Sequence, residues 1–397
     1  MRGRRIGGVL AGGIVGLGVG VLATLALQGT AAVPEHAPRP LAEPSPFTIP
    51  LRPDTFLAWV PGGMPPSAAA TLERMGARRV VVVASDNTWL TGSFDAEGEV
   101  VDDPPHSFAI PLEVAAVDPD RYAPFLPPGD RSLVVALARG QGVLGEMSAK
   151  LRGLGAGATM RFGDVEIEIA AVLPDELVGA HELLVSRETG LRIGVTHDRY
   201  ALLVPRGEPD TRALTRLIRG AFPPGTLVRV RAPGDTPYFR HGDAVLPPVE
   251  IKRLFGEFTA KPSPGQPGFL TVDDAWADAN IDTRRVPVLG TVTCNVALFP
   301  QLEGAMRELQ DRGLDRTIRT YSGCYSARHI NRIPTAGLSH HSWGIAIDVN
   351  VRWNAFGTEP DQDPRLVTVM ERWGFTWGGD WVLPDGMHFE YRRPPSG

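Results

Sequence analysis

The sequence contains little cysteine and no excess of basic residues. Lysine and arginine total 40 against 45 aspartates and glutamates, which gives a formal net charge of −5. Proteins that bind nucleic acid usually carry a clustered positive charge, so nucleic acid is excluded as the expected partner. The two cysteines form no Cys-x-x-Cys pair, which argues against a thioredoxin-type redox site and a zinc knuckle.

The length of the chain and its proline-rich segments indicate a protein with several domains. Its 397 residues suffice for two or three domains. Residues 31–54 are rich in proline and predict a semi-rigid extended linker. A second proline- and glycine-rich stretch at 259–269 predicts another linker. These two segments would separate a strand-rich domain at 55–258 from a C-terminal domain at 270–397.

The N-terminus has the pattern of a membrane segment. A basic stretch at residues 1–5 precedes residues 6–27, which carry no charge. That run is long enough to cross a hydrocarbon core of about 30 Å as a helix, whereas a cleaved signal peptide has a shorter apolar region. We therefore expect residues 1–30 to be an uncleaved single-pass anchor, with a cleaved signal and a secreted protein as the alternative. Both put the bulk of the chain outside the cytoplasm.

A row of glycines runs along this apolar segment. Gly8, Gly12, Gly16 and Gly20 recur at every fourth position, which would let two such helices pack closely as a homodimer. The alternative is a segment that is glycine-rich without pairing.

The two cysteines, Cys294 and Cys324, form an even pair in a chain expected outside the cytoplasm. A disulfide is the expectation in that compartment, with two free buried thiols as the alternative. The bridge would close a loop of about thirty residues and add roughly 3–4 kcal/mol of stability in the chain-entropy estimate.

Short apolar runs separated by turn residues indicate strands in the first domain. Residues 80–83 and 133–137 predict buried strands, and 165–169 alternate between apolar and acidic residues as a half-buried strand does. Residues 67–75 predict a helix. The stretches around 117–119 and at 145–186 loosely resemble, by pattern alone, the extracytoplasmic domains of certain transporter permeases.

One stretch imitates a dinucleotide-binding motif. Residues 140–145 read Gly-Gln-Gly-Val-Leu-Gly, and Glu166 lies about twenty residues further on, where a ribose-binding acid would stand. The segment that follows is short and glycine-rich, and no second strand–helix–strand unit follows it. We therefore interpret the motif as a glycine-rich turn.

The residues with the clearest potential for catalysis or metal binding lie in the last seventy or so residues. Ile345, Ile347 and Val349 alternate with smaller or polar residues, so a strand would bury these three and present Asp348 on its other face. His341 lies at the entry to that strand. The alternation recurs at residues 387–391, where it places His388 and Glu390 on one face.

If these two strands are neighbours, His341, Asp348 and His388 converge. Two imidazoles and one carboxylate form a three-ligand zinc site with an open fourth position, which is the catalytic arrangement. Such a site acidifies water and makes it nucleophilic near neutral pH. Asp385, three residues before His388, is the expected base that moves the proton of this water. Arg328 could stabilise a developing oxyanion or bind a substrate carboxylate.

Two motifs together carry a family resemblance. Ser-x-His-x-x-Gly-x-Ala-x-Asp at residues 339–348 and Asp-x-x-His-Phe-Glu at residues 385–390 resemble the D-alanyl-D-alanine carboxypeptidase family of zinc peptidases, which process peptidoglycan. This group includes L-alanyl-D-glutamate endopeptidases and D-alanyl-D-alanine dipeptidases. The resemblance implies His341, Asp348 and His388 as zinc ligands and Asp385 as catalytic base. It also implies a role for Arg328, through the Cys-Tyr-x-x-Arg version of the family.

Other polar and aromatic residues near these motifs are not expected to bind metal or to act as nucleophiles. His329 and His340 are expected to be ordinary surface or core residues, and Glu390 is expected to orient a ligand rather than to bind metal. Ser339 is not expected to be a nucleophile, because no partner set for serine chemistry is evident. Trp343, Trp377 and Trp381 could belong either to the core or to the substrate cleft.

The sequence thus predicts an α+β protein whose C-terminal zinc peptidase has a small antiparallel sheet. Helices are expected at residues 298–309 and from Asp363 onward. The expected activity is zinc-dependent hydrolysis of an amide bond in peptidoglycan stem peptides, as by a D-alanyl-D-alanine carboxypeptidase. The alternative is an extracytoplasmic binding module that holds wall peptide or an envelope partner without turnover.

Overall fold

The structure is a computed structural model of the chain. It describes Arg52 and residues 54–105, 107–207, 210–236, 238–244 and 246–395. The expected anchor or signal at residues 1–30, with its row of glycines, lies outside these ranges. Among the helices within them, none combines the length and the apolar character that crossing a membrane requires. The described part is a mixed α+β structure, as the sequence predicts, and it contains one large sheet and three small ones.

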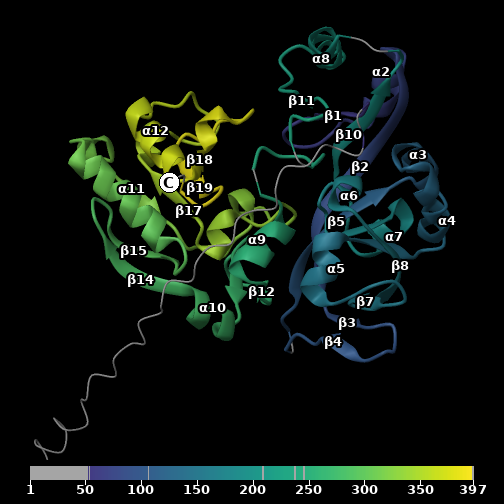
Figure 1. Cartoon of the computed structure of the whole chain (residues 1–397), viewed down its shortest axis with the longest axis horizontal. Helices are drawn as coiled ribbons and strands as arrows, with labels where there is room; N and C mark the ends of the chain where they lie inside the picture. Colours follow the sequence, from purple (N-terminus) through teal and green to yellow (C-terminus); the bar gives the residue numbers. More distant parts are fainter. Residues whose placement is uncertain are drawn as a thin grey trace, which may run out of the picture. The chain divides into compact units, whose positions relative to one another are not determined.

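Eleven strands in the described part form one mixed sheet, in the order β11-β1-β10-β2-β5-β9-β6-β8-β7-β3-β4 (Figure 1). Most neighbours are antiparallel, whereas β5–β9 and β6–β8 are parallel. The strands are β1 (Phe56–Trp59), β2 (Ala77–Leu90), β3 (Gly92–Phe94), β4 (Val100–Asp102), β5 (Ile110–Val117), β6 (Gly142–Gly145), β7 (Thr159–Phe162), β8 (Val165–Leu173), β9 (Leu183–Ser186), β10 (Asp198–Pro205) and β11 (Arg229–Arg231).

Short helices lie between these strands or, in the case of α9, after the last of them. They are α2 (Ala68–Arg74), α3 (Pro119–Tyr122), α4 (Leu133–Ala138), α5 (Glu146–Arg152), α6 (Asp175–Val178), α7 (Arg187–Arg192), α8 (Thr211–Gly220) and α9 (Pro248–Phe255). Helix α2 confirms the helix expected at 67–75. The alternating pattern at 165–169 is confirmed in β8, where Ile167 and Ile169 are buried and Glu166 and Glu168 are exposed.

The strand expected at residues 133–137 was wrong, because these residues begin helix α4. A short apolar run does not by itself distinguish a buried strand from a helix. Here only Leu137 is fully buried, while Val135 is half exposed. That distribution is the one-sided burial of a surface helix rather than the burial of a central strand.

The glycines at residues 142–145 of the apparent dinucleotide motif belong neither to a nucleotide-binding loop nor to a glycine-rich turn. Residues 142–145 are the strand β6 itself, and all four are buried. A side chain on Gly142 would meet Leu183 and Ile167, and one on Gly145 would meet Asp175 and the carbonyl of His181. The glycines therefore allow close packing around a central strand. Only Gly140, with a φ of 88°, lies in a turn.

The C-terminal part is built from hairpins, helices and a four-stranded antiparallel sheet of order β16-β17-β19-β18. This sheet confirms the small antiparallel sheet that the sequence predicts. The elements are β12 (Ala260–Pro262), β13 (Leu270–Val272), α10 (Asp274–Asn280), β14 (Ile281–Val286), β15 (Gly290–Asn295), α11 (Phe299–Asp311), β16 (Tyr321–Gly323), β17 (Ala346–Val349), α12 (Pro364–Arg372), β18 (Phe375–Trp377) and β19 (His388–Tyr391).

The stretch 259–269, expected to be a linker, is ordered as part of a hairpin. Strand β12 pairs antiparallel with β13, and the turn between them contains the prolines and glycines that suggested a spacer. Ala260 also bridges Ala109. Composition alone does not separate a tight hairpin turn from a linker, because both favour the same residues.

Two amphipathic helices cover the small sheet and fix its position. Leu302, Ala305, Met306 and Leu309 are the buried face of α11. Helix α12 starts where the sequence predicts, because the Asp363 carboxylate accepts the backbone N–H of Arg365. Both helices share one apolar core with Ile347 and Phe389 of the sheet. The opposite faces of β17 and β19 are thereby left for polar side chains.

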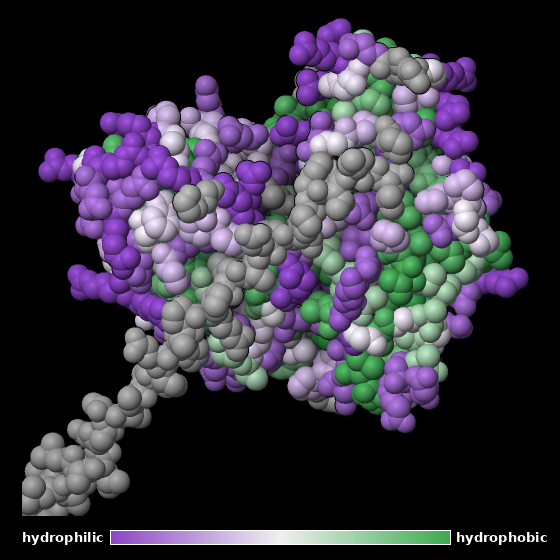
Figure 2. Space-filling model, viewed as in Figure 1, coloured by the Kyte–Doolittle hydropathy of each residue, from purple (hydrophilic) through white to green (hydrophobic). Residues whose placement is uncertain are grey.

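The surface differs between the two parts of the chain. On the face shown in Figure 2, hydrophilic residues dominate the C-terminal part, whereas apolar residues are more frequent on the strand-rich part. Exposed large apolar side chains of the strand-rich part include Val135, Val172 and Leu191. Isolated residues of this kind are normal on soluble proteins.

Candidate metal centre

The two strands that carry the motifs are neighbours in the sheet. Strand β17 pairs antiparallel with β19, and Asp348 lies directly opposite His388. The Nδ1 atom of His388 is 3.1 Å from Oδ1 of Asp348. Cross-strand partners project from the same face, so this register places the carboxylate and the imidazole side by side.

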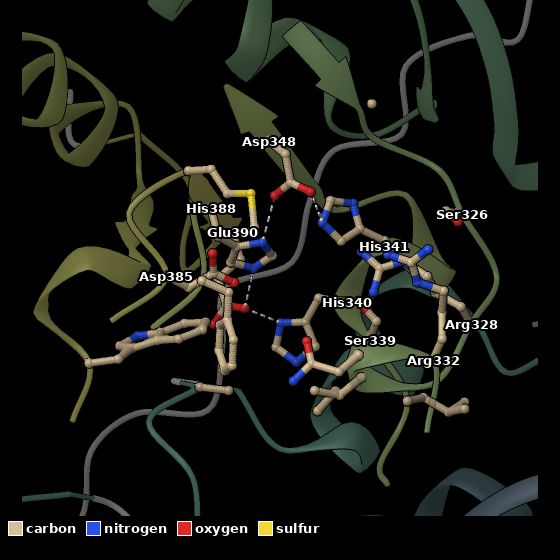
Figure 3. Close-up of a pocket in the computed structure, with 18 of the residues that line it drawn as sticks. Ser326, Arg328, Arg332, Ser339, His340, His341, Asp348, Asp385, His388 and Glu390 are labelled. Carbon is tan, nitrogen blue, oxygen red and sulfur yellow. Dashed lines mark hydrogen bonds and ion pairs between the residues drawn. The ribbon is translucent and has the colours of Figure 1, made fainter. Parts of the chain in front are cut away.

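His341 reaches the same point from outside the sheet. It lies in the 3₁₀ turn η5 (His340–Trp343), which ends at Gly344 with a φ of 65°. A side chain on Gly344 would come within 2.6 Å of the Asn295 nitrogen, so the chain can turn there only with glycine. The turn places Nε2 of His341 at 3.3 Å from Oδ2 of Asp348 (Figure 3).

These three side chains can hold one metal ion. His341, Asp348 and His388 each offer a ligand atom, and the atoms lie within 4.8 Å of one another. The Nδ1–H of His341 donates to the carbonyl of Cys324 at 2.7 Å, which leaves a lone pair on Nε2. This buried Nε2 makes no hydrogen bond to a described residue. A neutral imidazole aimed at a carboxylate without a hydrogen bond fits a metal ligand, and the donor set of two nitrogens and one oxygen suits zinc.

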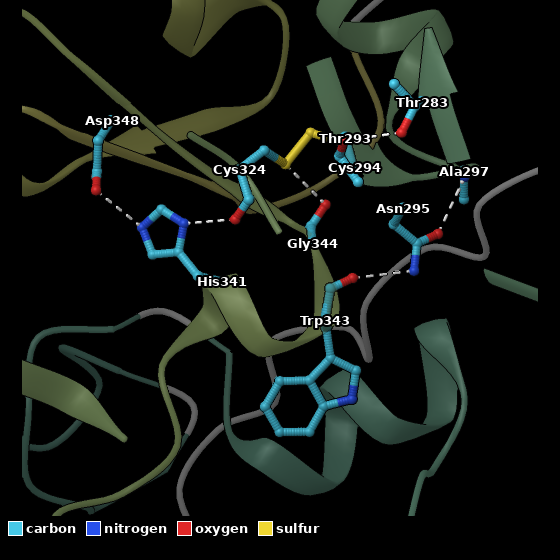
Figure 4. Close-up of a disulfide and its surroundings, with 10 residues drawn as sticks. All are labelled: Thr283, Thr293, Cys294, Asn295, Ala297, Cys324, His341, Trp343, Gly344 and Asp348. Carbon is cyan, nitrogen blue, oxygen red and sulfur yellow. Dashed lines mark hydrogen bonds and ion pairs between the residues drawn. A yellow bond between two sulfur atoms is a disulfide. The ribbon is translucent and has the colours of Figure 1, made fainter. Parts of the chain in front are cut away.

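The disulfide holds the carbonyl that orients His341 (Figure 4). Cys294, in β15, and Cys324, directly after β16, are bonded, with their Cα atoms 5.4 Å apart. The prediction of a bridge is therefore confirmed. Because Cys324 itself supplies the carbonyl that accepts from His341, the bridge connects the β14–β15 hairpin to a ligand of the candidate site.

Glu390 orients His388 from the side away from Asp348. The Oε2 atom of Glu390 lies 3.2 Å from Nε2 of His388 and 2.7 Å from Nδ1 of His340. Burial acts to raise the pKa of Glu390, but His340 and His388 hold it well below its usual range. Glu390 is thus an ionised, buried partner of the candidate metal ligand His388, which is the role expected from the sequence. Sequence reasoning missed the contribution of His340, because no spacing rule connects it to Glu390.

The carboxylates on both sides of His388 favour its protonated form. Although burial acts to lower the pKa of His388, hydrogen bonds to Asp348 and Glu390 raise it to about 10. A cation must therefore displace a proton to bind at Nδ1, as metal ions do at histidine ligands.

Asp385 lies beside the three candidate ligands, and its carboxyl group is not one of them. Its backbone carbonyl accepts the N–H of His388 at 3.1 Å, and its own N–H donates to Gly378 at 2.9 Å. This short turn fixes Asp385 relative to His388. The Oδ1 atom is buried and makes no hydrogen bond to a described residue. Burial is the main cause that raises the pKa of Asp385 to about 6. Such a carboxyl can accept and release a proton near neutral pH.

Arg328 contributes a free positive charge to the same pocket. Its backbone N–H and carbonyl both hydrogen-bond the hydroxyl of Ser342 at 3.0 Å, which anchors the main chain. The guanidinium is partly buried and has no hydrogen bond or ion pair within the described ranges. Its donors are therefore available to a carboxylate or an oxyanion. The pocket is lined by Arg328, His341, Asp348, Asp385, His388 and Glu390, among others.

The structure shows which of the three tryptophans near the motifs lie away from the pocket and which one lines it. Trp343 is buried in the core, and its indole N–H donates to the Gly256 carbonyl. Trp377 stacks near Phe389 and donates to the Gly386 carbonyl. Only Trp381 of the three lines the pocket, with its ring centroid 5.4 Å from that of His388. Trp381 is thus placed to contact a molecule bound in the pocket.

The site combines histidine and carboxylate groups that could hold a metal ion with a separate acid or base, an arrangement also used by metal-dependent hydrolases. Residues 333–391 match the family model described as D-alanyl-D-alanine carboxypeptidase. This match confirms the resemblance for that segment and supports a peptidase. No curated protein matches the chain.

Solved structures similar to this chain include two extracytoplasmic transporter domains. The periplasmic region of MacB from Actinobacillus actinomycetemcomitans has 12% identity and a TM-score of 0.31, over 46% of this chain and 90% of its own. The extracellular domain of the noncanonic ABC-type transporter YknZ from Gram-positive bacteria has 14% identity and a TM-score of 0.27, over 41% and 88%. At these scores the similarities do not define a shared fold.

Proposed function

We propose that this protein is a zinc-dependent peptidase that hydrolyses an amide bond in the stem peptides of peptidoglycan, as a D-alanyl-D-alanine carboxypeptidase. The observation that carries the proposal is the convergence of His341, Asp348 and His388, within a segment that matches the carboxypeptidase family. We further propose that the site faces the cell wall, with residues 1–30 as the membrane anchor, because the apolar N-terminal segment would place it outside the cytoplasm.

The proposed ligands are His341, Asp348 and His388, which would leave a fourth position for water or substrate. A bound zinc ion would supply Lewis-acid polarisation and acidify water. Asp385 would accept a proton from the attacking water and deliver it to the leaving amine. Its pKa of about 6 suits both transfers, because the group can hold and release a proton near neutral pH.

Arg328 would bind the negative charge of the substrate. A peptide that ends in D-alanine carries a terminal carboxylate, and the attacked carbonyl develops negative charge during hydrolysis. A guanidinium without an ion-pair partner in the described part can bind either group through a paired set of N–H donors. We assign the substrate carboxylate to Arg328 in the carboxypeptidase reaction.

The test is digestion of defined muropeptides with stems of four and five residues, followed by mass analysis. The full chain with zinc should release D-alanine from the five-residue stem, and removal of zinc by a chelator should stop the release. His388→Ala is the inactive control. Cleavage inside the stem would replace the carboxypeptidase by an endopeptidase. Muropeptides that bind but remain intact would favour the binding module, and turnover of unrelated peptides alone would refute a wall substrate.

A further inference from the structure

A second group of potential metal ligands lies in the strand-rich part, which the family match does not include. Glu113 comes from β5, His181 follows α6, and His241 lies between β11 and α9. Their ligand atoms lie within 4.8 Å of one another. His181 is completely buried and Glu113 is 8% exposed, whereas His241 is partly exposed.

Three side-chain atoms of this group, one from each residue, lack hydrogen-bond partners within the described ranges. They are Oε2 of Glu113, Nε2 of His181 and Nδ1 of His241, and each is buried. Nδ1 of His181 lies 2.9 Å from the carbonyl of Val178. A carbonyl only accepts, so Nδ1 carries the proton and Nε2 presents a lone pair. Buried polar atoms without partners are costly, and a cation shared by these donors would remove that cost.

The neighbouring Arg240 occupies one oxygen of Glu113 and adds a positive charge beside the group. Arg240 donates to Oε1 of Glu113 at 2.7 Å, which leaves Oε2 for another partner. The positive charge of Arg240 disfavours ions held by charge alone, such as calcium, and favours one bound by imidazole nitrogen.

The group repeats the donor set of the C-terminal centre. Each has two imidazoles and one carboxylate. In each, one histidine donates its Nδ1–H to a main-chain carbonyl, Val178 for His181 and Cys324 for His341. This hydrogen bond fixes the tautomer and direction of a ligating imidazole. Among the described residues, the buried carboxylate oxygens without a partner are those of Glu113, Asp385 and Glu390, so the second group has no additional acid of this kind, which suits a structural role.

We propose that Glu113, His181 and His241 form a second, structural site for a zinc-like transition-metal ion. The site would attach the stretch between β11 and α9, which has no helix or strand among its described residues, to the large sheet at β5. A metal ion that binds only the folded state stabilises it by mass action. The proposal is independent of the peptidase function, because none of its three residues belongs to the C-terminal centre.

The experiment measures zinc in the full chain after removal of loosely bound metal. His341→Ala/His388→Ala, which disables the C-terminal centre, should retain about one zinc per chain. Adding His241→Ala to that background should remove this zinc and lower the thermal unfolding midpoint in zinc to its value in chelator. His197→Ala, a histidine of the strand-rich part outside both groups, is the matched control and should keep the metal.

A second measurement tests the proposal in case the variant with His241→Ala folds poorly. Cobalt(II) added to the His341→Ala/His388→Ala chain should give the visible absorption of a tetrahedral site with nitrogen ligands, and Glu113→Gln should weaken cobalt binding at least tenfold while retaining side-chain volume. The proposal is overturned if the His341→Ala/His388→Ala chain binds neither ion. It is equally overturned if His241→Ala and Glu113→Gln leave binding unchanged, which would assign the gap between the three side chains to water.

Discussion

Asp348 and His388 face each other across two antiparallel strands, with Oδ1 of the carboxylate 3.1 Å from Nδ1 of the imidazole. This pair connects two motifs separated by forty residues in the chain. His341 reaches the other oxygen of the same carboxylate, so Asp348 is the centre of the candidate site.

Removing the proposed base should separate metal binding from turnover. Asp385→Asn should lower kcat by about 10²–10⁴-fold, because the attacking water loses its proton acceptor. Zinc content should equal that of the unchanged chain, since Asp385 is not among the three ligands. Elemental analysis and a D-alanine release assay measure the two quantities. Asp380→Asn, an exposed acid in the neighbouring turn, is the control. Full activity in Asp385→Asn would remove this residue from the role of base.

Activity should show an acid limb near the pKa of Asp385. Burial raises this pKa to about 6. A general base acts in its deprotonated form, so kcat/KM should fall as the pH drops below about 6 and level off above it. A pH profile measured at saturating zinc tests this, and Asp385→Asn should lack that limb. A limb that persists unchanged in the variant would assign it to another group.

Zinc binding at the C-terminal centre should release a proton and strengthen with pH. The pKa of His388 is raised to about 10 by its two carboxylate partners, so the residue is protonated at neutral pH and must lose that proton to bind. Affinity should therefore rise up to about tenfold per pH unit below that value. Calorimetry in buffers of different ionisation enthalpy measures the proton count. His388→Ala should abolish both the release and the binding at this centre.

Loss of the disulfide should affect both stability and metal affinity. Cys294→Ser/Cys324→Ser should lower the free energy of unfolding of the C-terminal part by roughly 3–4 kcal/mol. It should also weaken zinc binding about 10–100-fold, because the Cys324 carbonyl orients His341. Denaturant titration and competition with a chelator measure these effects. A reductant should reproduce them in the unchanged chain and have no further effect on the variant. Unchanged zinc affinity would show that the carbonyl keeps its place without the bridge.

The strand-rich part should lose stability as the pH rises toward 7. Burial raises the pKa of Asp175 to about 7, above the value of 3.8 for an unperturbed aspartate. The folded state then holds a proton that the unfolded state releases, so the stabilisation present at low pH is lost as the pH passes through about 7. Asp175→Asn should reduce this loss by on the order of 2 kcal/mol, allowing for solvent screening.

Unfolding midpoints at pH 5 and pH 8 measure the effect. The exposed Asp164→Asn, in the turn between β7 and β8, is the matched control and should not change the pH dependence. An Asp175→Asn variant whose stability falls with pH as steeply as that of the unchanged chain would contradict the assignment.

The sequence by itself determined the local arrangement of the candidate site. Alternation along residues 345–350 and 387–391 is a property of strand geometry, so the faces that carry Asp348 and His388 could be predicted without a structure. Short spacing likewise places Asp385 near His388. The helix starting after Asp363 and the pairing of the two cysteines also followed from local signals or from the expected compartment.

Only the tertiary structure decided which distant groups meet. The register of β17 against β19 brings Asp348 to His388, and the disulfide loop delivers the Cys324 carbonyl to His341. Glu113, His181 and His241 carry no motif, because ligands from three separate elements need no fixed spacing. The helix at residues 133–138 was not predicted, because the tertiary structure also decides which side of a segment is buried. Burial on one side or two depends on neighbouring elements, and a run of apolar residues does not specify its neighbours.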